Sequence, residues 1–197
     1  TNFAQWNGQG RQLRVAFNVS ARLVQVGLKE IIVDALHRSG LAPASLEMEI
    51  TETVLIGNHN DAEVLLRDLK KLGLRLSLDD FGTGYSSMSY LSRFQVDKIK
   101  IDAIFVKSLA SGDKQREIVA SMIRSAQRLN IQVVAEGFET VEPMQQLRAI
   151  GGRLLQGGIF AAALPAPDFL HWVGSPQTSM PAMTSQQTFP PALPGAS

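Results

Sequence analysis

The sequence predicts an α/β fold, a TIM-like (β/α) barrel that is incomplete at its N-terminus, with about six of eight βα units present. Short apolar, β-branched segments alternate with amphipathic segments along the chain, which is typical of a parallel sheet with helical crossovers. Most of the apolar segments also carry a polar residue at or near their C-terminal end. An open doubly wound sheet fits the alternation as well, but its ligand-binding residues gather at one crevice between a few strands. A polar residue from nearly every strand favours a barrel, where all strands end at one mouth.

The six predicted strands are short runs rich in Val, Ile, Leu and Phe, at residues 13–19, 46–51, 74–80, 96–102, 131–137 and 154–160. Between them, apolar residues recur every three or four positions and predict amphipathic helices over 23–40, 61–73 and 114–130. Several amphipathic segments stop at a residue that tolerates the left-handed conformation, namely Gly40, Gly73, Asn130 or Gly151. Residues 84–94 predict a shorter and less regular helix.

The barrel domain is predicted to cover residues 1–173. Residues 174–197 are rich in Pro, Ser, Thr and Gln without periodicity. Such a composition buries too little apolar surface to offset its ordering entropy, so we expect a disordered tail. Because a barrel of this kind has eight strands, we expect about two βα units to precede Thr1.

The composition of the chain excludes several classes of function. The 197 residues are 45% hydrophobic and carry a formal net charge of +1, which gives no electrostatic case for nucleic-acid binding. The absence of cysteine excludes a disulfide framework and a thiolate metal site, and suits a reducing compartment. No apolar run approaches the roughly 20 residues that span a bilayer. We therefore expect a cytoplasmic domain, in a parent that other segments can anchor to a membrane.

Polar side chains collect at the predicted mouth of the barrel. They comprise oxygen ligands and one cation: Asn18, Glu49, Asp79, Asp80, Glu136 and Lys100. Carboxylate and amide oxygens suit Mg²⁺ or Mn²⁺ and not a zinc site built on His and Cys. The adjacent carboxylates of Asp79 and Asp80 would repel one another without a cation, and a bridging Asp is typical of two-metal phosphoester hydrolysis.

Each of these residues also has a structural interpretation. Asp79 and Asp80 alone fit a turn or a helix cap, and Asn18 alone fits a turn. Glu49 alternates with apolar neighbours, as on a solvated strand. Lys100 lies between two isoleucines and needs a carboxylate partner if it points inward. Glu136 and Glu139 fit caps of a helix beginning near Thr140; we favour the ligand role for Glu136 and a capping or loop-support role for Glu139.

Six motifs in order resemble the EAL family of cyclic di-GMP phosphodiesterases: FNVSA, MEITE, DDFGTGYSSMSYL, KIKIDAIFV, VVAEGFET and LLQGG, within about residues 13–172. The resemblance implies hydrolysis of cyclic di-GMP to linear pGpG with two Mg²⁺ or Mn²⁺ ions in bacterial second-messenger signalling. It further implies a homodimer through the barrel and regulatory domains upstream. The alternative is a non-catalytic domain that acts as a cyclic di-GMP receptor or a protein-interaction module.

The resemblance also implies a role for each motif residue. Asn18, Glu49 and Asp79 would hold one ion, with Asp79 bridging to a second ion held by Asp80 and Glu136. The catalytic side chains would be Lys100, which orients the attacking water, with Glu136 and Gln156, of which Gln156 contacts that water or the phosphate. Glu52 would support the loop that begins at Asp79.

The chain departs from the family pattern at three places. The Glu-Ala-Leu signature is not in this chain, so we expect the chain alone to have impaired activity. Gly158 stands where the family usually has an aromatic residue, and Ala161 to Ala163 replace a cationic or polar residue. The last two departures affect the ligand-binding rim and leave the metal ligands unchanged.

Overall fold

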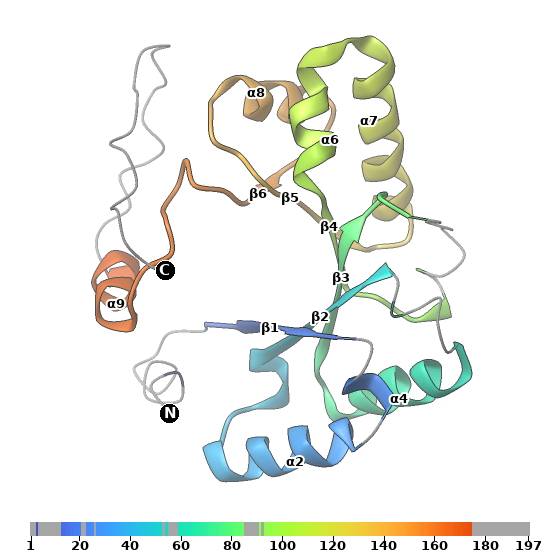
Figure 1. The fold of residues 1–197 in the computed structure, drawn as a ribbon, viewed down its shortest axis with the longest axis vertical. Helices are drawn as coiled ribbons and strands as arrows, with labels where there is room; N and C mark the ends of the chain where they lie inside the picture. Colours follow the sequence, from blue (N-terminus) through green and yellow to red (C-terminus); the bar gives the residue numbers. More distant parts are fainter. Residues whose placement is uncertain are drawn as a thin grey trace.

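Six parallel strands in consecutive order form the centre of the structure, which confirms the predicted α/β architecture (Figure 1). This structure is a computed structural model that describes residues 3, 13–20, 23–25, 27–52, 54, 59–84, 91 and 93–174. The strands are β1 (Val15–Val19), β2 (Leu46–Thr51), β3 (Arg75–Phe81), β4 (Lys98–Ile101), β5 (Gln132–Ala135) and β6 (Leu154–Leu155). Each strand pairs in parallel with the next, as in one arc of a (β/α) barrel.

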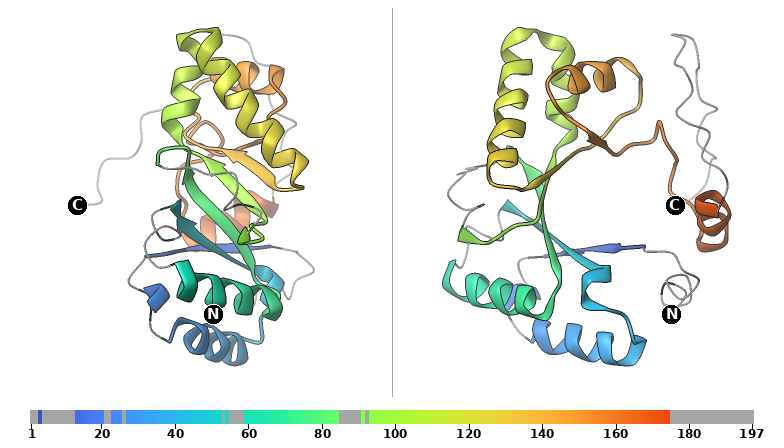
Figure 2. Two further views of the ribbon diagram at one scale, coloured as in Figure 1. Left: turned by 90° about the vertical axis from the view of Figure 1, so that its right-hand side faces the viewer. Right: turned by 180° about the vertical axis from the view of Figure 1, so that it is seen from behind.

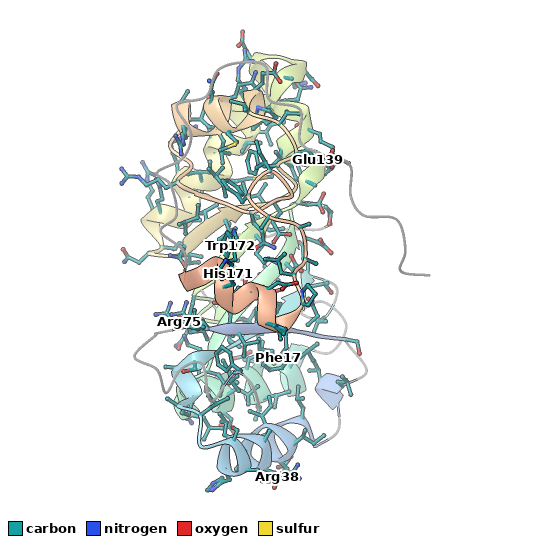
Figure 3. All side chains as sticks on the ribbon, turned by 90° about the vertical axis from the view of Figure 1, so that its left-hand side faces the viewer. Phe17, Arg38, Arg75, Glu139, His171 and Trp172 are labelled. Carbon is teal, nitrogen blue, oxygen red and sulfur yellow. The ribbon has the colours of Figure 1, made fainter. Side chains whose placement is uncertain are left out.

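Helices connect the strands and cover the outer side of the arc. The described helices are α2 (Leu28–Ser39), α4 (His59–Leu72), α6 (Ala103–Ser108), α7 (Asp113–Arg128), α8 (Glu142–Ala149) and α9 (Ala166–Gly174). In the described residues, short 3₁₀ turns lie at Leu23–Gln25, Pro43–Ser45 and Leu109–Ser111. Figure 2 shows α2 and α4 beside the first strands and α6, α7 and α8 beside the last ones. Helix α9 stands apart from the others, with His171 and Trp172 in the foreground of Figure 3.

All four predicted helix-end residues have a positive φ, with Gly73 at 97° and Gly151 at 95°. Gly40 has φ 66° and donates its N–H to the Leu36 carbonyl oxygen at 2.9 Å, and Asn130 has φ 57°. No helix in the described part of the chain is both long enough and apolar enough to cross a membrane.

The structure differs from the sequence-based prediction at β6, at α6 and at the start of α2. The helix predicted over 23–40 begins only at Leu28, after a 3₁₀ turn at Leu23–Gln25, because Gly27 adopts a left-handed conformation with φ 64°. The sixth strand is only two residues long, because the chain turns at Gly157 against the backbone of Phe138. Helix α6 was not predicted; it begins directly after β4, where the Asp102 carboxylate accepts a hydrogen bond from the Ile104 N–H at 2.7 Å. Most of the predicted helix 84–94, and residues 175–197 of the predicted tail, lie outside the described residues.

The two faces of the sheet differ in chemistry. One face is apolar and packs into the main core with the helices, through Met48, Ile50, Leu76, Leu78 and Ile99. Alternate positions on the same strands point to the other face, which carries Glu47, Glu49, Ser77, Lys98 and Lys100, all with little exposure. Because charged groups are costly to bury unless paired, this second face is where functional contacts are expected.

Candidate active site

The Lys100 ammonium is the centre of the charged face. Its Nζ lies 2.9 Å from Glu49 Oε2, 3.2 Å from Asp79 Oδ1 and 2.8 Å from Glu136 Oε1. Glu49, Asp79 and Lys100 lie on the consecutive strands β2, β3 and β4, and Glu136 directly follows β5. The structure therefore brings together four of the predicted site residues at the carboxyl ends of four neighbouring strands.

Charge and burial shift the protonation equilibria here. Burial alone would lower the pKa of Lys100, but the carboxylates of Glu136 and Glu49 outweigh it and the pKa is raised. Burial raises the pKa of Glu136, and the attraction of Lys100 only partly offsets this effect. With the lysine 6% exposed, each ion pair has limited access to water.

The two adjacent aspartates separate because the backbone changes direction between them. Asp80 has φ 54°, a left-handed conformation, and the register of β3 against β4 shifts between Leu78 and Phe81. Asp79 faces Lys100, whereas Asp80 lies near Asp102. Burial raises the pKa of Asp80, and Asp79 and Asp102 raise it further.

The remaining predicted residues border this centre. Asn18 pairs in register with Glu49 and is exposed on the edge strand β1. The backbone of Gln156 donates to the Ala135 oxygen at 2.9 Å and accepts from the Phe138 N–H at 3.3 Å, which holds Gln156 beside the strand end that carries Glu136.

Glu52 is buried directly after β2. Its Oε2 lies 3.0 Å from the point where a Cβ on Gly84 would stand, so its carboxylate packs against the loop that follows β3. Residues 85–90 of that loop lie outside the described residues.

A second pair of opposite charges lies one step toward the amino ends of the same strands. Lys98 forms an ion pair with Glu47, which is 2% exposed, and Arg14 Nη1 lies 3.7 Å from Glu47 Oε2. Lys98 and Glu47 precede Lys100 and Glu49 by two residues, so both pairs point to the same face and cross β3 in the same way.

Two findings go beyond the sequence prediction. Asp102 lies near Asp80 at the mouth; its signal in the sequence was an Asp between a strand and a following apolar segment, a typical N-cap position. The alternative that Glu136 and Glu139 cap a helix is wrong, because α8 follows Val141 and has no side-chain cap. Glu139 is exposed at the surface, 3.9 Å from Lys107 Nζ (Figure 3).

The donor chemistry fits a hard divalent cation. Four carboxylates oppose one lysine, and Glu136 Oε1 is buried and accepts no well-directed hydrogen bond from the described residues, although it contacts Lys100. In the described part of the chain, however, no three acidic or histidine side chains surround a common metal position. The carboxylates of Glu49, Asp79 and Glu136 converge on the Lys100 ammonium instead.

The chain matches a known protein family over most of its length. The model of the EAL domain matches residues 1–163. The chain belongs to the EAL domain family. The resemblance inferred from the six sequence motifs is thereby confirmed.

Curated EAL proteins are similar to this chain over most of its length. The cyclic di-GMP phosphodiesterase NbdA of Pseudomonas aeruginosa is 41% identical over 155 residues, which are 78% of this chain and 20% of NbdA. The cyclic di-GMP phosphodiesterase PdeR of Escherichia coli is 37% identical over 170 residues, 86% of this chain and 26% of PdeR. The chain thus spans about a fifth to a quarter of the length of these relatives.

Solved EAL structures share the fold. The MucR phosphodiesterase in complex with c-di-GMP superimposes with a TM-score of 0.80 at 34% identity, covering 85% of this chain and 69% of that one. BlrP1 of Klebsiella pneumoniae, in a complex with manganese and cy-diGMP, gives 0.73 at 36% identity, covering 80% and 41%. The predicted TIM-like architecture of the EAL domain is confirmed by these neighbours.

Proposed function

We propose that this EAL domain hydrolyses cyclic di-GMP to linear pGpG with two divalent ions, Mg²⁺ or Mn²⁺, as part of a longer signalling protein. The single observation that supports this most is the cluster of Glu49, Asp79 and Glu136 around Lys100, in a chain similar to the MucR phosphodiesterase solved with c-di-GMP. Two-metal hydrolysis of a phosphodiester uses acidic groups to hold the cations, and a nearby donor can orient the water; this cluster contains groups of both kinds.

In this proposal, Asn18, Glu49 and Asp79 would hold one ion, Asp80 and Glu136 would hold the other, and Asp79 would contribute to both. When bound, such ions make water a stronger nucleophile and neutralise charge on the phosphate. Lys100 donates a hydrogen bond to the attacking water and so orients it toward phosphorus. Gln156, on the neighbouring strand end, contacts the same water or a phosphate oxygen.

Glu52 has a supporting role in the proposal. Its buried carboxylate packs against Gly84 and keeps the loop after β3 in place, and this loop directly follows the part of β3 that carries the two aspartates. The effect of Glu52 on the ions is therefore indirect. A Glu52→Gln variant should lose metal affinity, and extra Mg²⁺ should partly restore its turnover.

The alternative function is a receptor or interaction module that binds cyclic di-GMP without turnover. A domain of that kind has no need to keep a full set of metal ligands. Every ligand that the family motifs assign within this chain is present, which favours the enzyme. Dimerisation through the barrel, regulatory domains in the same protein and a cytoplasmic location remain part of the proposal.

The deciding experiment changes Asp79 to Asn in the protein that contains this chain. The variant loses a negative charge that both ions would share. If the activation barrier of hydrolysis rises by about 4 kcal/mol as a result, turnover slows about a thousandfold. Turnover of cyclic di-GMP is measured against Mg²⁺ and Mn²⁺ concentration, with folding checked by circular dichroism. Glu139→Gln, which removes an exposed carboxylate nearby, is the matched control and should leave turnover unchanged. Near-normal turnover of folded Asp79→Asn at any metal concentration would contradict the two-ion site.

A further inference from the structure

The carboxylates around Lys100 are arranged as in a cation-binding site, with the Lys100 ammonium as the cation. Three carboxylate oxygens from Glu49, Asp79 and Glu136 lie 2.8–3.2 Å from one nitrogen. These carboxylates are the ones that the proposed function assigns to the metal ions. Because these oxygen atoms already contact the Lys100 ammonium, a divalent ion that binds them would have to displace it.

The neighbouring lysine, Lys98, has a different balance of charge around it. Lys98 faces the single carboxylate of Glu47, which Arg14 also approaches, so positive charge there matches or exceeds negative charge. Lys100 faces three carboxylates, with Asp80 next to one of them, so one positive charge opposes four negative charges. The ammonium holds these carboxylates together but leaves a large negative excess that a divalent ion neutralises better.

We infer that the Lys100 ammonium takes the place of a metal ion in the metal-free domain and holds the carboxylates of Glu49, Asp79 and Glu136 together. Because the ammonium must move away from these carboxylates before a metal ion binds them, Lys100 lowers the metal affinity of the domain. This inference rests on the proposed function, because it takes those carboxylates to be metal ligands. Withdrawal also leaves the ammonium at the edge of the metal site, where it can donate to the water. The lysine thus lowers metal affinity while it serves the reaction.

Calorimetric titration with Mn²⁺ alone tests the inference without any measurement of turnover. Lys100→Met removes the competitor and should bind Mn²⁺ at least about tenfold more tightly than the wild type. Lys100→Arg keeps a cation and should bind no more tightly than the wild type. Lys107→Met is the matched control: it removes the same unit of charge from an exposed lysine and should leave the affinity within about twofold.

A second measurement covers the case in which Lys100→Met does not fold. In wild-type protein with isotope-labelled lysine, addition of Mg²⁺ should shift the NMR signal of the Lys100 ammonium, while the signal of Lys98 stays in place as an internal control. An unchanged Lys100 signal during saturable Mg²⁺ binding overturns the inference and leaves the metal site intact. Equal affinities of Lys100→Met and Lys107→Met overturn it as well. If the wild type and all variants bind no metal, the proposed function fails together with the inference.

Discussion

Replacement of Gly157 by alanine should destabilise the domain and disturb the site. A Cβ on Gly157 would stand 2.8 Å from the carbonyl carbon of Phe138 and closer still to its nitrogen and oxygen. These are backbone atoms, and they cannot withdraw easily because the Phe138 side chain is 0% exposed in the core and its N–H and carbonyl bond Gln156 and Ile159. Overpacking of a core lowers the free energy of unfolding by about 1–3 kcal/mol. Because this clash involves the backbone of a buried residue, we expect Gly157→Ala to lower it by about 3 kcal/mol.

The adjacent glycine supplies the control. A Cβ on Gly158 has no atom within 4 Å, so Gly158→Ala should be neutral or stabilising by up to about 1 kcal/mol. Urea unfolding followed by circular dichroism measures both variants, and a loss of 3 kcal/mol corresponds to a fall in Tm of about 6–12 °C in a chain of this size. Gly157→Ala should also weaken Mn²⁺ binding, because it pushes the strand end of Gln156 away from Glu136. Equal unfolding free energies of the two variants would refute this account of the short sixth strand.

Two further predictions concern the charged face. Lys98→Met leaves the buried Glu47 carboxylate without its main partner and should cost about 3–5 kcal/mol of unfolding free energy, most of which the double variant with Glu47→Leu should recover; equal losses in the single and double variants, measured by urea unfolding, would contradict this. Burial raises the pKa of Glu136 above 4.5, so the folded metal-free protein binds this proton more tightly than the unfolded chain does. The folded protein therefore loses stability as the pH rises from 4.5 through the raised pKa of Glu136. Glu136→Gln should therefore be more stable than the wild type without metal near neutral pH, with the difference vanishing as pH falls below about 4.5; an advantage that persists in acid would show another cause.

The positions of the strands and the chemistry of the mouth were predictable because both depend on local patterns. Short apolar, β-branched runs identified the strands, and the alternation around Glu49 placed it on the opposite face from Met48 and Ile50, although its burial was not predicted. The polar residues at the strand ends then followed from the rule that parallel strands present these ends to one mouth.

The contacts that distinguish this site depended on the register between strands, and no local pattern specifies it. The tertiary structure alone decided that Lys100, on β4, meets Glu49, two strands away, and so fills the space between the carboxylates. The register shift that turns Asp80 toward Asp102 is likewise a property of the pairing of β3 with β4. Side chains distant in sequence meet only where the sheet, packed against its helices, sets the offset of each strand, so the sequence by itself determined the members of the site and the fold determined which of them touch.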